Sequence, residues 1–77
     1  MNHPEFVKAF GLRVKSLRNE RKMSQQNLAD LSDVDIRTIQ RIEQNLHNPT
    51  IDLAYSISIG LKIELIELLK IDYKFKK

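Results

Sequence analysis

Apolar side chains recur every three or four residues over most of this 77-residue chain, the spacing of helices with one buried face. The first such run lies between residues 4 and 22. Pro4 and Glu5 suit the first turn of a helix, because that turn does not need the missing proline N–H and the helix dipole stabilises a carboxylate there. The expected buried stripe of this helix consists of Phe6, Phe10, Val14 and Leu17.

A second and a third predicted helix follow, joined by a short turn. Ser24 is a good N-cap because its hydroxyl can accept an N–H from the first turn, whereas Asn27 stands where a full capping box would have Glu or Gln. The apolar face of the second helix consists of Leu28, Ala29 and Leu31. Residues 32–35 are typical of a turn, and Asp35 can cap a third helix over residues 36–44.

The third helix separates apolar from polar side chains. At about 100° per residue, Ile39 and Ile42 share one face. The opposite face, which carries mostly long hydrogen-bond donors, consists of Ile36, Arg37, Gln40, Arg41 and Gln44. The small Ala29 permits a close crossing of the two helices. This pattern is typical of a helix-turn-helix unit, whose second helix enters the major groove of DNA.

Two more helices are predicted between residues 49 and 69, which makes the fold all-α. Thr50 can cap the fourth helix. The core positions of the fourth helix are expected to be Ile51, Ala54, Ile57 and Leu61. The fifth helix, over about residues 64–69, turns Leu65 and Leu68 inward.

Composition narrows the class of protein. The chain is 42% hydrophobic and 30% charged, which is ordinary for one small globular domain. It has no cysteine, so disulfides, thiolate metal sites and thiol nucleophiles are excluded. No metal site, cofactor or enzyme activity is expected, because neither histidine has companion ligands and no catalytic arrangement is present. No apolar run is long enough to span a membrane and the start is unlike a signal peptide, so a cytoplasmic location is expected.

The distribution of charge is more informative than the formal net charge of +3. Residues 1–22 carry six basic side chains against two acidic ones, whereas residues 23–45 carry two against four. Basic charge is therefore concentrated outside the third helix. With double-stranded DNA as the partner, we expect sequence readout combined with a modest contribution from phosphate contacts.

A set of short motifs resembles one known family. The run S-Q-x-x-L-A, followed by V-D, T-I-x-R-I-E and N-P-T, is similar to the Cro and phage-repressor type of helix-turn-helix protein, the XRE family. The matching residues are Ser24, Gln25, Leu28, Ala29, Val34, Thr38, Ile39, Arg41, Ile42, Glu43, Asn48, Pro49 and Thr50. The resemblance implies a five-helix, lambda-repressor-like DNA-binding domain. Small restriction–modification controller proteins share this size and plan.

Three residues depart from the family pattern, which has glycine at these places. Asp33 lies in the turn, Asn45 follows the third helix and Lys62 lies between the last two helices. Aspartate and asparagine tolerate the left-handed conformation better than most residues, so the first two connections are expected to keep the family geometry. The geometry of the last connection stays open.

The resemblance also implies roles for individual side chains. The expected DNA-binding residues are Gln25, Gln26, Ile36, Arg37, Thr38, Gln40, Arg41, Gln44, His47 and Asn48. Arg37 and Arg41 can each donate two hydrogen bonds to guanine, and Gln40 can pair with adenine. An ion pair between Arg18 and Glu43 is expected to connect the first helix to the third.

The predicted function is a sequence-specific, DNA-binding transcriptional regulator, an activator or a repressor, that binds an inverted repeat as a homodimer. Residues 1–70 would form the helix-turn-helix domain, and residues 71–77 a basic tail that either dimerises or frays. The expected dimer interface consists of Tyr55, Ile59, Ile66, Leu69, Ile71 and Tyr73. Such a dimer would place its two third helices about 34–36 Å apart. The alternative is an antitoxin-like interaction module whose last two helices bind a different protein.

Overall fold

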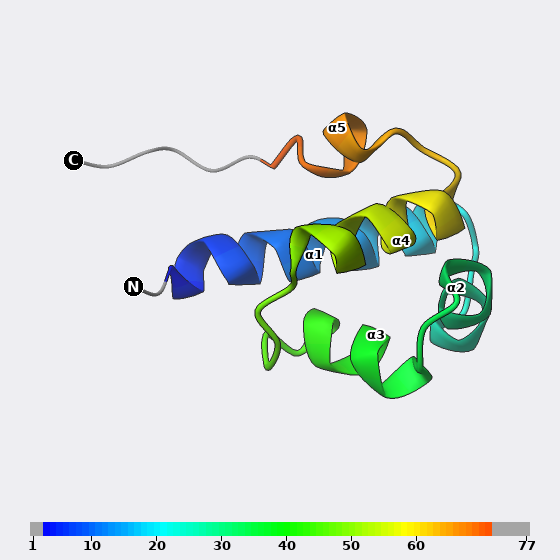
Figure 1. The fold of residues 1–77 in the computed structure, drawn as a ribbon, viewed down its shortest axis with the longest axis horizontal. Helices are drawn as coiled ribbons and strands as arrows, with labels where there is room; N and C mark the ends of the chain where they lie inside the picture. The colour runs from blue at the N-terminus through cyan, green and yellow to red at the C-terminus, as the bar shows by residue number, and fades with distance from the viewer. Residues whose placement is uncertain (1–2, 72–77) are drawn as a thin grey trace.

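The computed structural model describes residues 3–71, and its regular elements are all helices. They are α1 (Pro4–Glu20), α2 (Gln25–Ser32), α3 (Ile36–Glu43), α4 (Ile51–Leu61) and α5 (Leu65–Leu68). The all-α, five-helix prediction is therefore confirmed. In Figure 1, α1 and α4 overlap across the middle of the view, with α3 on one side of them and α5 on the other.

One core joins all five helices. Its buried apolar members are Phe10, Val14, Leu17, Leu28, Ala29, Ile39, Ile42, Ala54, Ile57, Leu61 and Leu68. Every helix contributes at least one of these side chains, so each short helix gains most of its stability from packing against the others rather than from its own hydrogen bonds. Two glycines permit the closest approaches. A Cβ at Gly11 would overlap the carbonyl oxygen of Ile42, and one at Gly60 would overlap Oγ of Ser32.

Side-chain caps begin the helices where the sequence predicts them. Oγ of Ser24 accepts the Asn27 N–H at 2.9 Å, and Oδ1 of Asn27 accepts the Ser24 N–H at 3.1 Å. The capping box is therefore complete, because an asparagine amide oxygen replaces the expected Glu or Gln acceptor. Asp35 caps α3 by accepting the Arg37 N–H at 2.8 Å. Thr50 caps α4 in the same way.

Four non-glycine residues have a left-handed backbone. Asp33 and Asn45 have φ values of 57° and 63°, as the family pattern implies. Lys62 has φ 61° and ends α4, which settles the geometry of the last connection. Lys22 also has a left-handed backbone, with φ 54°, which the sequence did not indicate. Because a left-handed residue cannot continue a right-handed helix, α1 ends at Glu20 rather than at Lys22.

Three apolar residues predicted to be buried are exposed instead. Leu31 is 53% exposed because α2 turns Leu28 and Ala29 toward the core, which leaves Leu31 on the outer face. Ile51, at the first turn of α4, is 68% exposed. Phe6 is 42% exposed and lines an open apolar hollow together with Ile51 and Leu69, beyond the edge of the closed core.

Candidate nucleic-acid interface

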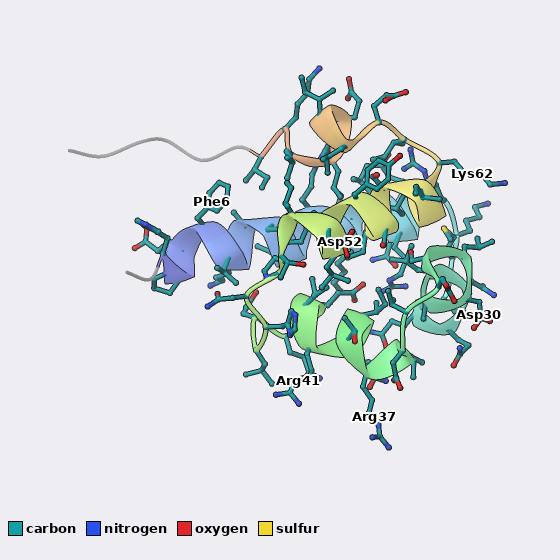
Figure 2. All side chains as sticks on the ribbon, in the orientation of Figure 1. Phe6, Asp30, Arg37, Arg41, Asp52 and Lys62 are labelled. Carbon is teal, nitrogen blue, oxygen red and sulfur yellow. The ribbon has the colours of Figure 1, made fainter. Side chains whose placement is uncertain are left out.

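The outward face of α3 presents two arginines to solvent. Arg37 and Arg41 are exposed, and Figure 2 shows both side chains pointing away from the body of the molecule on the same side of α3. On the opposite face Ile39 and Ile42 are buried, with 0% and 1% of their surface exposed. The predicted division of this helix into a buried apolar face and an outward donor face is therefore present.

The other predicted residues of α3 differ in exposure. Gln44 is exposed just past the end of the helix, whereas Thr38 and Gln40 are half-buried. Ile36 is half-buried and packs against the core. Ile36 was expected on the outer face, and the structure places it at the boundary between the outer face and the core.

The two glutamines at the start of α2 both engage carboxylates. Nε2 of Gln25 donates to Oε1 of Glu43 at 3.1 Å, so the side chain bridges α2 and α3. Nε2 of Gln26 donates to Oδ1 of Asp30 at 2.8 Å within α2. Gln25 is half-buried and Gln26 is exposed. The bridge from Gln25 to Glu43 was not predicted, because nothing in the residue spacing shows that the two side chains meet.

The expected ion pair between Arg18 and Glu43 is present and has two parallel hydrogen bonds. Nε and Nη2 of Arg18 donate to the two carboxylate oxygens of Glu43 at 2.8 and 3.0 Å. Nη1 of Arg18 donates to the Met23 carbonyl at 2.7 Å. The side chains are 11% and 3% exposed, so the pair lies largely out of water.

This network determines how α3 is held. The hydrogen bonds with Glu43 raise the pKa of Arg18, so the guanidinium stays charged at any pH that the fold tolerates. Glu43 accepts from Arg18 on α1 and from Gln25 on α2. Because two helices hold the last residue of α3, the direction of its outward face is set by buried, charge-assisted contacts.

The loop after α3 continues the same surface. His47 is half-buried and Asn48 is exposed. Asn48 and Asn45 line a shallow hollow together with Lys8 from α1. The sequence did not indicate that α1 contributes a side chain here, because Lys8 precedes this loop by about forty residues.

The predicted dimer-interface residues are mostly exposed. Tyr55 and Ile59 on α4 are each 54% exposed, and Ile66 and Leu69 near α5 are 71% and 38% exposed. Ile71 is half-buried and packs against the core. The remaining member, Tyr73, and the rest of the predicted tail lie outside the described residues.

Two other kinds of site are absent from residues 3–71. That part of the chain contains no group of three or more histidine, aspartate or glutamate side chains placed to hold a metal ion. It also contains no helix with the length and apolar content needed to cross a membrane.

Comparison with known proteins places the chain in a family. A family model described as Helix-turn-helix (HTH_3) matches residues 14–68. No curated protein sequence matches significantly. The wild-type restriction–modification controller protein C.Esp1396I is 31% identical with a TM-score of 0.77, over 83% of this chain and 87% of its own.

Two further structures are similar. The controller protein C.AhdI from Aeromonas hydrophila is 31% identical with a TM-score of 0.77, over 80% of this chain and 94% of its own. An HTH_3 family transcriptional regulator from Vibrio cholerae is 26% identical with a TM-score of 0.81, over 84% of this chain and 36% of its own. The chain thus belongs to the HTH_3 family of XRE-type helix-turn-helix proteins and is similar to restriction–modification controller proteins over most of its length.

Proposed function

We propose that this protein is a sequence-specific DNA-binding transcriptional regulator that inserts α3 into the major groove of its operator. The observation that carries the proposal is the pair of exposed arginines, Arg37 and Arg41, on a helix held from behind by the pair between Arg18 and Glu43. A rigid helix with outward guanidinium groups can read base edges, because each guanidinium can donate two hydrogen bonds to one guanine.

The remaining residues of α3 fit smaller roles in the same groove. Gln40 is placed to pair with adenine through its amide. Ile36, at the boundary of the outer face, can touch a thymine methyl group. The hydroxyl of Thr38 and the amide of Gln44 would contact the DNA backbone beside the groove.

Phosphate contacts are proposed for the two segments that flank α3. Gln25 and Gln26 lie in the first turn of α2, where backbone N–H groups and the helix dipole favour an anion. Nε2 of Gln25 is engaged by Glu43, so its backbone N–H is the group we assign to the phosphate. His47 and Asn48 in the loop after α3 would contact the next stretch of backbone.

We further propose that two copies associate through the exposed apolar residues of α4 and α5 and bind an inverted repeat. The similar protein C.Esp1396I has been crystallised as a tetramer in complex with its natural 35 base-pair operator. In this chain Tyr55, Ile59 and Ile66 are each more than half exposed. Burying them against a second copy would remove apolar surface from water and leave α3 free on each subunit.

The test of this function is selection of binding sites from a random duplex library. The parent protein is expected to enrich one inverted repeat. Arg37→Ala should weaken binding to that site by about 1–3 kcal/mol and relax the preference at one base step, because one bidentate contact is lost. Lys70→Gln, which removes a positive charge beside α5 on the far side of the molecule, is the control and should keep the parent preference. Identical site preferences for Arg37→Ala and the parent would refute the assignment of α3.

A further inference from the structure

Three lysines in the first part of the chain are spaced seven residues apart. Lys8 and Lys15 lie on α1, and Lys22 follows its end. Seven residues turn an α-helix through about 700°, which is 20° short of two full turns. Lys8 and Lys15 therefore share one face of α1, separated by about 10 Å along its axis.

The contacts of α1 show that this face lies beside α3. At Gly11, three residues after Lys8, an added Cβ would overlap the carbonyl oxygen of Ile42. Arg18, three residues after Lys15, bonds Glu43. Because residues three and four apart lie next to one another on a helix, Lys8 and Lys15 flank the strip of α1 that packs on the end of α3.

The two ends of this lysine row meet the two segments that flank α3. Lys8 lines a hollow with Asn45 and Asn48, which lie in the loop after α3. Lys22 comes two residues before Ser24, the cap of α2. The row of Lys8, Lys15 and Lys22 therefore extends from the loop after α3 to the beginning of α2.

These positive charges are not neutralised locally. The ion pairs among residues 3–71 join Arg18 to Glu43 and Lys70 to Glu67, so none involves the row. All three lysines are exposed. The carboxylate of α3 belongs to Glu43, which already forms an ion pair with Arg18. Glu5 lies one turn from Lys8 without forming an ion pair with it.

We propose that Lys8, Lys15 and Lys22 bind the phosphates of the DNA strand beside the segment that α3 reads. The inference rests on the proposed function and adds a contact surface on α1. A lysine ammonium is a mobile point charge on a long stem, so it can meet a phosphate without fixing a base sequence. The row would therefore contribute affinity and salt dependence, while α3 contributes sequence preference.

The experiment removes these charges and measures how binding depends on salt. Lys8→Gln, Lys15→Gln and the double variant are compared with the parent on the selected operator and on a random duplex. Lys22→Asn tests the third lysine of the row. Asparagine is chosen here because it tolerates the left-handed backbone of this position. Each variant should weaken binding to both duplexes by the same factor. Each single substitution should also reduce the slope of log K against log salt by about 0.9 over roughly 50–200 mM, and the double variant should reduce it by about 1.8, because each phosphate contact contributes about 0.9.

Lys70→Gln is the control for net charge, because it removes one positive charge just after α5, the helix that lies across α1 and α4 from α3 (Figure 1). It should leave the slope at the parent value, which separates direct phosphate contacts from an effect of net charge. Circular dichroism melting checks that each variant is folded, which is expected for substitutions of exposed side chains.

The results distinguish this proposal from the proposed function. If the parent binds its selected site and the lysine variants keep its salt slope, the row does not touch DNA, although α3 still reads it. A loss of sequence preference in the lysine variants would also contradict the proposed role of the row, because phosphate contacts carry no base information. If the parent binds no duplex, the proposed function fails and the row fails with it.

Discussion

Gly60 shows how much one residue can decide in a domain of this size. It lies where α4 crosses α2, and an added Cβ would overlap Oγ of Ser32 and approach Cδ1 of Leu28 at 3.1 Å. Ser32 is itself buried, and its hydroxyl has no hydrogen-bond partner among the described residues. The close crossing therefore requires glycine on one helix and leaves a polar atom unsatisfied on the other.

We predict that Gly60→Ala destabilises the protein even though alanine favours a helix over glycine by about 1 kcal/mol. Overpacking at a buried crossing costs about 1–3 kcal/mol, and the steric term should win. Ser32→Ala alone should be nearly neutral, because it removes a buried hydroxyl that has no partner. Combining Ser32→Ala with Gly60→Ala should recover part of the stability that Gly60→Ala loses. Urea unfolding of the four proteins measures these values, and strictly additive effects would contradict the proposed overlap.

At the scale of the elements, hydrogen bonds connect three helices at the end of α3. Ile39 and Ile42 bury the inner face of this helix, and Asp35 caps its start. At its other end Glu43 accepts hydrogen bonds from Arg18 on α1 and Gln25 on α2. Each short helix alone would be marginal in water, so these contacts between elements decide both the existence and the direction of α3.

We predict strong coupling between the two partners of this ion pair. Arg18→Met should cost about 3–5 kcal/mol, because it leaves a carboxylate that is 3% exposed without its cation. Glu43→Leu should be costly for the same reason. Arg18→Met with Glu43→Leu should lose much less than the sum, since neither charge remains buried. A double-mutant cycle by chemical denaturation measures this coupling, and a value near zero would mean that the pair is energetically unimportant.

At the scale of the whole molecule, α3 and α5 lie on different sides. The arginines of α3 point outward on one side of the α1–α4 pair, and α5 lies on the other (Figures 1 and 2). The apolar residues left exposed on α4 and α5 include Tyr55, Ile59 and Ile66. The proposed association through them would leave α3 accessible in both copies. The alternative of a different protein partner receives no support from the similar structures.

We predict a homodimer of about twice the 9.0 kDa chain mass in analytical ultracentrifugation. Ile59→Asp and Ile66→Asp should each produce a monomer and weaken operator binding, because a charge would have to be buried in the interface. Leu31→Asp serves as the control, since Leu31 is also about half exposed but lies on α2. A parent protein that sediments as a monomer at every concentration would exclude the proposed interface.

Much of this protein was determined by short-range features of its sequence. Ser24, Asp35 and Thr50 begin helices because each can accept a nearby backbone N–H, and Asp33 and Asn45 permit left-handed turns. These rules involve residues only a few positions apart. The starts of α2, α3 and α4 and the buried face of α3 could therefore be predicted. The ion pair between Arg18 and Glu43, which are far apart in the sequence, was predicted from the family resemblance.

Only the tertiary structure decided which predicted faces closed into the core and which side chains met. Leu31 and Ile51 carry the helical spacing of buried residues but are exposed, because burial depends on how far each helix is rotated against its neighbours. The bond from Gln25 to Glu43 and the position of Lys8 beside Asn48 depend on the same packing. Helical periodicity specifies faces, whereas contacts between distant segments specify which faces meet.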